Sequence, residues 1–261
     1  MVCLSFDIEE FDLPTEHGVD IPFERQIEVS RHGAVRILDI LRRHGVRATF
    51  FTTVSFAKSA PEIVERIVAE GHELASHGMR HSSFRISDLS DSRREIEKLS
   101  GSEVKGYRQA RMMKLDEREV AKAGYLYDSS LNPTFIPGRY MSLSAPRTPY
   151  IKDGVVQIPA SVTPMVRFPL FWLAAHLLPQ SLYRLLAWRT LVHDGHFVTY
   201  FHPWEFYDLH TMPDYKIPGI VSMNSGEGMA KRLDALVECM KSRGMEFATI
   251  GELAETVLKK H

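Results

Sequence analysis

The chain has 261 residues, with 32 basic and 33 acidic side chains, a formal net charge of −1 and a hydrophobic content of 44%. These proportions are typical of a globular protein and exclude a disordered or fibrous chain. Because the charges nearly balance, no global field draws the protein to phosphate backbones or to an anionic surface, and we expect no nucleic-acid partner.

The start of the chain and its cysteines indicate where the protein acts. The opening residues, MVCLSFDIEE, contain no secretory signal, and Cys3 and Cys239 are far apart and form no CxxC pair. The longest apolar run, FPLFWLAAHLL, ends at Pro179 after about half the length of a membrane span. We therefore expect a cytoplasmic protein without a transmembrane segment, and a peripheral contact with a membrane stays open.

Short apolar runs alternate along the chain with longer segments of helical periodicity, which is typical of a parallel sheet covered by helices. The runs expected as strands are 2–8, 48–54, 72–77, 155–160, 196–201 and 246–250. The segments expected as helices are 30–43, closed by Gly45, then 61–70, opened by Pro61, and then 88–100, 115–123 and 226–243. Since no repeat or flexible linker interrupts this pattern, residues 1–261 are predicted to form a single α/β domain.

One segment, residues 161–192, breaks the alternation because it is helical, rich in aromatic residues and too long for a simple crossover. We interpret it as a helical insertion beside the sheet. Trp172 and Trp188 lie in apolar stripes at helical spacing and are assigned to the core. If the segment is exposed, it forms a lid, a homo-oligomer contact or a membrane-facing patch, and the sequence leaves these three open.

Chemically active side chains follow several of the predicted strands. Since the carboxyl ends of parallel strands gather at one edge of a sheet, such side chains are expected to converge there. The residues concerned are Asp7, Glu9, His77, His81, Arg108, Asp128 and His202.

Two histidines and an acidic stretch indicate a metal site. His77 and His81 are four residues apart after a strand, a spacing that puts two imidazoles on one face of a helical turn, where they can share an ion. In FDIEE the period of two directs Asp7 and Glu9 to the same side. One carboxylate and two imidazoles are a common ligand set for a catalytic zinc ion. The plainer interpretation, two surface histidines and a solvated acidic loop, stays open at this point.

The order of these motifs resembles the polysaccharide deacetylase family, also called carbohydrate esterase family 4 or the NodB homology family. Five motif regions between residues 7 and 206 match, so the resemblance covers most of the chain. It implies a distorted (β/α) barrel of about seven parallel strands. The phrases FDIEE and HPWE are similar to a branch of the family with a DVED-like first motif.

The resemblance implies a role for each residue of the first two motifs. Asp7 is the implied general base, and Glu9, His77 and His81 are the implied metal ligands. Glu10 is expected to point to the opposite side of the strand. The resemblance implies one divalent ion, expected to be zinc, although cobalt, nickel and manganese accept the same ligands.

The later motifs complete the implied site. GYRQAR supplies Arg108 to orient the base, but it has Gln109 and Ala110 where the family more often has alanine and proline. His202 of FHPWEF is the implied general acid, and Asp128 of GYLYDSS is its implied partner.

Together these roles imply a metal-dependent hydrolase that removes acetyl groups from an N-acetylated glycan, with Trp204 and Tyr107 in contact with the sugar. Two other functions stay open. Relatives similar to allantoinases use the same barrel to hydrolyse a cyclic amide, and fold alone does not separate them. A catalytically silent glycan-binding protein is the second alternative, favoured by Ile8 in place of a second aspartate and by the missing proline after Arg108.

Overall fold

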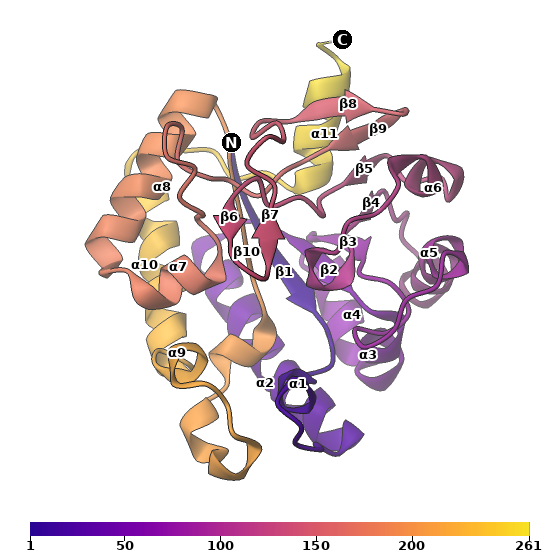
Figure 1. Ribbon diagram of the computed structural model, residues 1–261, viewed down its shortest axis with the longest axis vertical. Coiled ribbons are helices and arrows are strands. Elements are labelled where there is room, and N and C mark those ends of the chain that lie inside the picture. The colour runs from indigo at the N-terminus through magenta and orange to yellow at the C-terminus, as the bar shows by residue number, and fades with distance from the viewer. Residues whose placement is uncertain (261) are drawn as a thin grey trace.

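The computed structural model describes residues 1–260 as a curled sheet with helices packed on its outside (Figure 1). The sheet strands are β1 (Val2–Ile8), β2 (Thr49–Thr52), β3 (Glu73–Ser76), β4 (Gly106–Tyr107), β5 (Tyr127–Asp128), β8 (Tyr150–Lys152), β9 (Val155–Gln157) and β10 (Phe197–Phe201). A separate hairpin consists of β6 (Phe135–Ile136) and β7 (Tyr140–Met141).

The helices lie between these strands and after the last of them. They are α1 (Leu13–Glu16), α2 (Phe23–His44), α3 (Val54–Ser59), α4 (Pro61–Ala69), α5 (Ser87–Ser100), α6 (Glu117–Lys122), α7 (Trp172–Leu177), α8 (Gln180–Asp194), α9 (Gly219–Ser222), α10 (Glu227–Ser242) and α11 (Ile250–Leu258). Short 3-10 helices are η1 (Ala110–Met112), η2 (Pro203–Phe206), η3 (Leu209–Thr211) and η4 (Pro213–Tyr215).

The strands follow the order β10-β1-β2-β3-β4-β5-β9-β8 across the sheet. Every neighbouring pair from β10 to β9 is parallel, whereas β8 pairs antiparallel with β9 at the edge. The result is a half-barrel of seven parallel strands, which confirms the fold expected from the sequence. Ser161 approaches the free edge of β10, because its backbone N–H donates to Val198 O at 2.8 Å and its hydroxyl accepts from Val198 N at 2.9 Å.

The apolar run at the start of the chain explains the position of β1 in the middle of the sheet. All seven residues of β1 are buried, since both faces of a central parallel strand are covered. Leu4, Phe6 and Ile8 belong to the larger core cluster, whereas Cys3 belongs to a smaller cluster. The alternation places Asp7 on the same side of the strand as Cys3, away from the larger cluster.

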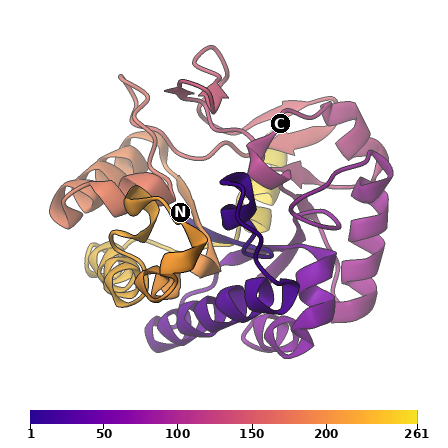
Figure 2. The same cartoon turned by 60° about the horizontal axis from the view of Figure 1, so that its bottom comes forward.

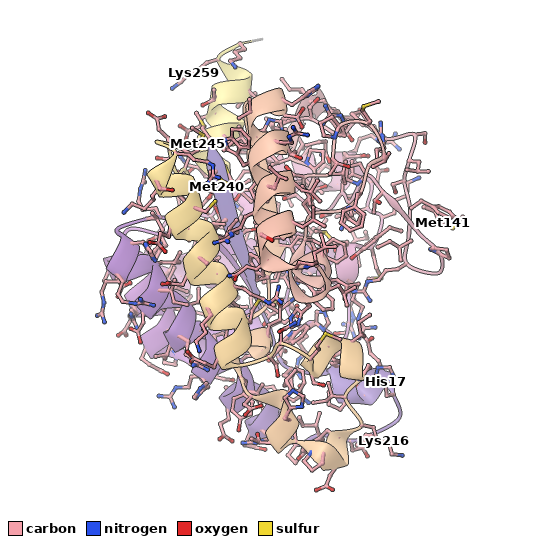
Figure 3. The ribbon with its side chains drawn as sticks, turned by 90° about the vertical axis from the view of Figure 1, so that its left-hand side faces the viewer. His17, Met141, Lys216, Met240, Met245 and Lys259 are labelled. Carbon is pink, nitrogen blue, oxygen red and sulfur yellow. The ribbon has the colours of Figure 1, made fainter. Side chains whose placement is uncertain are left out.

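Two expected elements differ in the structure. Residues 246–250 form no strand, because only Phe247 pairs with Val2 in an isolated bridge. Thr249 instead caps α11 through a reciprocal capping box with Glu252, so the chain enters a helix before a strand can form. In the segment 161–192 the helices α7 and α8 begin only at Trp172, after a turn that the bridge between Val162 and Pro169 closes, and α8 lies beside α10 on the outside of the half-barrel (Figure 3).

The β6–β7 hairpin stands apart from the half-barrel, as Figure 2 shows. None of the helices in residues 1–260 combines the length and the apolar character that a passage through a lipid bilayer requires.

Helix α2 packs directly against η2, and a glycine makes this contact close. A Cβ atom built on Gly33 would lie 1.7 Å from the carbonyl oxygen of Pro203, which is closer than any real contact. Pro203 follows His202, so the absence of a side chain at Gly33 fixes the position of the last sequence motif against α2.

We therefore expect Gly33→Ala to displace η2 and to lower the free energy of unfolding by about 1–3 kcal/mol, because the overpacked backbone must shift. The matched control is Gly228→Ala in α10, where the added Cβ would meet Asn224 at an ordinary 3.5 Å. The free energy of unfolding of this control should stay unchanged or rise by up to about 1 kcal/mol. Urea unfolding of both variants measures the difference, and equal stabilities would contradict the packing argument.

Candidate metal and catalytic site

Most of the predicted site residues converge at the carboxyl ends of β1, β3 and β10, around a cavity of about 240 Å³. The predicted residues that line it are Asp7, Glu9, His77, His81, His202 and Trp204. Arg108 is completely buried and reaches this cavity only through its ion pair with Asp7.

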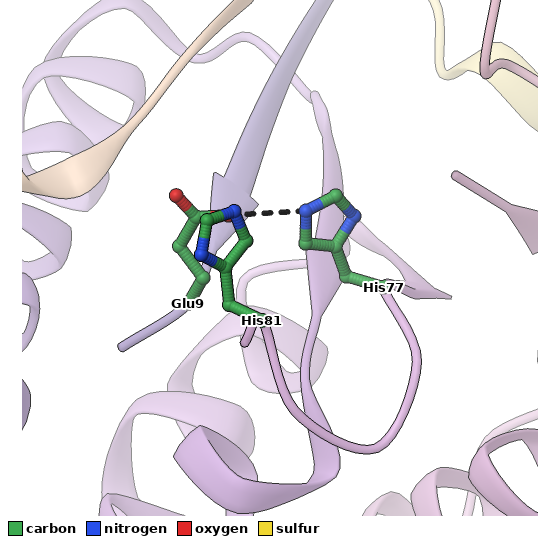
Figure 4. A group of neighbouring side chains, drawn as sticks. All are labelled: Glu9, His77 and His81. Atoms are coloured by element: carbon green, nitrogen blue, oxygen red, sulfur yellow. Dashed lines mark hydrogen bonds and ion pairs between the residues drawn. The ribbon is translucent and has the colours of Figure 1, made fainter. Parts of the chain in front are cut away.

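Glu9, His77 and His81 direct one donor atom each toward a common point (Figure 4). Nε2 of His77 lies 3.0 Å from Glu9 Oε2, and Nε2 of His81 lies 3.3 Å from the same oxygen. The three donor atoms all lie within 4.8 Å of one another, and each side chain is at most 9% exposed. A carboxylate oxygen and two imidazole nitrogens form a donor set that fits a divalent cation such as zinc.

The second nitrogen of each imidazole is held by a neighbouring group. Nδ1 of His77 lies 2.8 Å from the carbonyl oxygen of Arg108, and Nδ1 of His81 lies 2.7 Å from Asp12 Oδ1. Both partners are acceptors, so the Nδ1–H group of each ring donates and the Nε2 atom is left to face Glu9. Such outer partners fix the orientation of metal-binding imidazoles.

The loop that carries the two histidines is not helical, so the expected helical turn is wrong. Gly78 turns the chain directly after β3 with a φ of +89°, and Arg80 then pairs with Ser83 in an isolated bridge. The imidazole rings of His77 and His81 still lie nearly parallel, with centroids 6.1 Å apart, because this tight loop returns the second ring to the first.

The charges of this cluster attract one another strongly. Burial alone raises the pKa of the Glu9 carboxyl, but the imidazoles of His81 and His77 outweigh it and hold this pKa well below its ordinary value. Burial lowers the pKa of His81, whereas the carboxylates of Glu9 and Asp12 outweigh that effect and raise it to about 9. A field that favours a proton here also favours a metal cation, which competes with protons for the same atoms.

Asp7 forms a buried ion pair with Arg108. The guanidinium NH1 donates to Asp7 Oδ1 at 2.6 Å and to the Ser5 hydroxyl at 2.9 Å. Its Nε and NH2 donate to the carbonyl and hydroxyl oxygens of Ser129 at 3.0 and 2.9 Å. These partners compensate the buried positive charge. The other carboxylate oxygen, Asp7 Oδ2, lies 4.0 Å from Nε2 of His202.

His202 is held from its other side by Glu205. Nδ1 of His202 lies 3.0 Å from Glu205 Oε1, and Glu205 Oε2 lies 3.1 Å from Nε2 of His176. Glu205 and His176 are completely buried. Burial lowers the pKa of His202, but the hydrogen bond to Glu205 and the nearby carboxylate of Glu9 outweigh it and raise this pKa above its ordinary value.

The expected pairing of Asp128 with His202 is wrong. The Asp128 carboxylate accepts hydrogen bonds from the hydroxyl and, at 3.0 Å, the backbone N–H of Ser130, and it lines a second cavity of about 800 Å³. Within residues 1–260, no ion pair of 4.0 Å or less joins Asp128 to His202, because four strands separate β5 from β10. Glu205 holds the imidazole instead.

Tyr107 does not reach the sugar side of the site, so its expected substrate contact is also wrong. The side chain is completely buried, packs against Tyr125 with ring centroids 5.2 Å apart, and donates its hydroxyl to Gln109 Oε1 at 2.6 Å. Tyr107 thus fixes Gln109, one of the residues that depart from the family motif.

Two tryptophans form an aromatic wall of the cavity. The Trp204 ring stacks on His202 with centroids 4.7 Å apart, and its Nε1 donates to Glu9 Oε1 at 3.4 Å. Trp172 lies edge-on to both rings, at 5.6 Å from His202 and 5.5 Å from Trp204. Trp172, which the sequence assigned to the core, therefore also lines the cavity.

Sequence reasoning missed Asp12, Glu205 and Trp172. The spacing of Glu205, three residues after His202, is that of a capping box and could have identified it. Asp12 belongs to the acidic stretch after β1. Because the strand has ended before this position, the alternation of side chains does not predict where Asp12 points. The sequence does not distinguish Trp172 as a cavity residue, since apolar residues at helical spacing are equally typical of a helix packed in the core.

The half-barrel with this cluster at its carboxyl edge has the NodB-type deacetylase fold. The model of the family described as polysaccharide deacetylase matches residues 17–117, which include both imidazoles of the cluster and Arg108. The match to this family model and the shared fold support a relationship to carbohydrate esterase family 4.

Individual relatives are similar over shorter stretches or at lower identity. A chitooligosaccharide deacetylase of Sinorhizobium fredii is 40% identical over 60 residues, which are 23% of this chain and 28% of that protein. A Mycobacterium smegmatis crystal structure that bears the polysaccharide deacetylase name has a TM-score of 0.68 at 21% identity and covers 99% of this chain and 90% of its own. An allantoinase has a TM-score of 0.63 at 15% identity over 97% of this chain and 88% of its own. Both structures show the shared fold.

We expect Glu9→Gln to weaken zinc binding by at least about 100-fold, because the substitution removes the only negative charge among the three donor residues. The control is Glu10→Gln. Glu10 is equally buried, but it accepts a hydrogen bond from the Thr53 hydroxyl at 2.7 Å and lies outside the donor cluster. Calorimetric zinc titration should leave the control near the wild type, and the reverse ranking would show that the wrong carboxylate was chosen.

A second prediction concerns Asp128, whose pKa burial raises to about 6. A carboxyl group with a raised pKa in the folded state stabilises the fold at low pH, and this contribution is lost as the pH rises through about 6. An asparagine at this position would carry no charge and could still accept from the Ser130 N–H. We expect the stability of Asp128→Asn relative to the wild type to rise between about pH 4, where the carboxyl of the unfolded chain ionises, and about pH 6, by on the order of 2–3 kcal/mol in total. Urea unfolding across this range measures it, and a pH-independent difference would contradict the prediction.

Proposed function

We propose that the protein is a metal-dependent hydrolase that removes acetyl groups from an N-acetylated glycan and releases acetate. The proposal is carried by one observation, the meeting of the Glu9–His77–His81 cluster with Asp7 and His202 around a single cavity. The relative named as a chitooligosaccharide deacetylase supports the same class of reaction.

We propose zinc as the ion, held by Glu9, His77 and His81. When bound there, it would supply a Lewis acid that polarises the acetamide carbonyl and makes a water molecule more acidic. Three protein donors leave a coordination position for substrate or water, which is typical of catalytic and not of structural zinc sites.

Asp7 is proposed as the general base. Its Oδ1 accepts from Arg108, so the ion pair fixes the carboxylate, while Oδ2 lies 4.0 Å from Nε2 of His202. A carboxylate in this position can take the proton from a water molecule that attacks the acetyl carbon. Arg108 acts through Asp7 and is proposed as a positioning residue.

His202 is proposed as the general acid. Its pKa is raised, and Glu205 holds its Nδ1–H group, so Nε2 carries the proton that faces the cavity. As the C–N bond breaks, this proton passes to the departing amine, while the attacking oxygen remains on the acetyl carbon. The products are acetate and an amino sugar. Glu205 compensates the imidazolium and is proposed as a positioning residue.

The surroundings of the site support a glycan longer than one sugar. Trp204 and Trp172 present aromatic surface on one side of the cavity, where a sugar ring can pack. On another side the cavity shares Arg111, Arg139 and Tyr140 with the second cavity of about 800 Å³. Space for further rings is therefore contiguous with the reaction site.

The departures from the family motifs have structural explanations that weaken the case for a silent relative. Ile8 is completely buried in the core, and the next residue, Glu9, supplies the carboxylate to the two imidazoles. Gln109 accepts the Tyr107 hydroxyl, and Ala110 begins η1, so neither disturbs Arg108. Hydrolysis of a cyclic amide stays the alternative, because the allantoinase shares the fold.

We expect Asp7→Asn to keep zinc binding close to the wild type but to lower deacetylation by about 10²–10⁴-fold, the range of general-base catalysis. The asparagine can still accept from Arg108, so the fold should persist, and thermal unfolding checks that it does. Acetate release from N-acetylglucosamine oligomers by the zinc-loaded enzyme measures activity. A fully active Asp7→Asn variant would remove the base assignment.

The same assay separates the three functions. Acetate release from the oligomers supports the proposal, ring opening of allantoin alone would establish the cyclic-amide alternative, and zinc binding without either reaction would favour a glycan-binding role.

A further inference from the structure

Large apolar side chains are exposed at two neighbouring tips beside the cavities. One tip is the β6–β7 hairpin with the residues after it, and the other is the turn before α7. We call them the apolar tips; they consist of Phe135 (51% exposed), Met141 (77%) and Leu143 (48%) in the first, and Met165 (94%), Val166 (79%) and Phe168 (37%) in the second. Figure 3 shows Met141 far out from the body of the protein.

Hydrogen bonds join the two tips into one surface. The Thr134 hydroxyl donates to Arg167 O at 2.8 Å, and NH1 of Arg167 donates to Ala145 O at 2.7 Å. The base of the hairpin is thus joined to the turn, so the two segments that carry the exposed apolar side chains lie next to each other. A surface of this kind on a monomer marks an interaction site.

The charge of this part of the chain is strongly biased. Residues 129–193 contain six lysines and arginines but only one acidic residue, Asp153, although the whole chain is nearly neutral. At the tips themselves, neither Arg139 nor Arg167 has an acidic partner within 4.0 Å in the described chain, residues 1–260. Arg147 and Lys152 of this range pair with Asp194 and Glu117, so the charges without an acidic partner at the tips are those of Arg139 and Arg167.

We propose that the apolar tips dock the protein on the surface of an anionic lipid membrane. Exposed methionine, valine and phenylalanine side chains would enter the interface between head groups and acyl chains, while Arg139 and Arg167 would face the anionic head groups. The charge favours lipid over a second copy of this chain, because a two-fold contact through the tips would bring like charges together. The attachment would be peripheral, since no helix within residues 1–260 could span a bilayer.

The position of the tips adds a consequence that rests on the proposed function. Tyr140, next to Met141 in the hairpin, lines both cavities, so docking would bring the mouth of the site to the membrane surface. The surface would then select a glycan attached to a lipid, whose sugar lies at the head-group level.

Sedimentation with vesicles tests the docking. We expect the full chain to bind vesicles of phosphatidylcholine with about 30% phosphatidylglycerol at least about tenfold more strongly than vesicles of phosphatidylcholine alone, and binding to weaken as salt is raised. The variant Phe135→Ser/Met165→Ser/Val166→Ser should lose at least about tenfold of this binding. The matched control, Ile86→Ser/Leu99→Ser at and in α5, removes apolar side chains that are 52% and 39% exposed and should bind as the wild type does.

Each outcome is decisive for the docking alone. Absence of binding to anionic vesicles, or equal losses in the two variants, would overturn it, as would a stable dimer that the tip variant abolishes. None of the substituted residues lines either cavity, so acetate release from soluble oligomers reports separately on the proposed function.

Discussion

The buried guanidinium of Arg108 is the interaction on which the site depends. It is the largest fully buried side chain, and its nitrogens reach Asp7 on β1 and Ser129 beyond β5. The carbonyl oxygen of the same residue accepts from the His77 imidazole after β3. Arg108 therefore fixes the Asp7 carboxylate and the His77 imidazole. Its contacts link residues at the ends of β1, β3 and β5. Loss of this charge would leave Asp7 buried without its partner, which is costly in a low-dielectric interior.

The His202 side of the site is held in place by other residues. His202 follows β10 and is held by Glu205, which also contacts His176 of α7, while η2 is pressed against α2 at Gly33. The imidazole opposite Asp7 is thus positioned by helices on the outside of the half-barrel, independently of Arg108. Because β1 and β10 are paired neighbours with Phe6 opposite Phe201, the distance between Asp7 and His202 is set by the pairing of these two strands.

The sequence predicts the sheet well, and it also places Glu9, His77 and His81 at one edge, for a physical reason. Parallel strands that are buried on both faces have continuous apolar sequences. The polar residues that follow such strands lie at the carboxyl edge of the sheet, so Glu9, His77 and His81 could be placed near one another from the sequence alone. Contacts between side chains of distant elements follow no such rule. Glu205, and not Asp128, holds His202 because of the order of the strands, and Tyr107 is buried because of side-chain packing. Local periodicity in the sequence contains neither kind of information.

The acids around the cavity differ in how their charges are compensated, and this difference bears on the proposed ion. Asp7 has Arg108, Asp12 has the Nδ1–H group of His81 with Arg111 at 3.6 Å, and Glu205 lies between two imidazoles. Glu9 is buried; its Oε1 has the indole of Trp204 and, at 4.0 Å, Nε2 of His202, whereas its Oε2 faces the Nε2 atoms of His77 and His81. With both Nδ1 positions protonated, these nitrogens are acceptors whenever the rings are neutral. A buried carboxylate oxygen that faces two acceptors is unfavourable, so Oε2 of Glu9 favours a cation at the centre of the cluster, either protons or a metal ion.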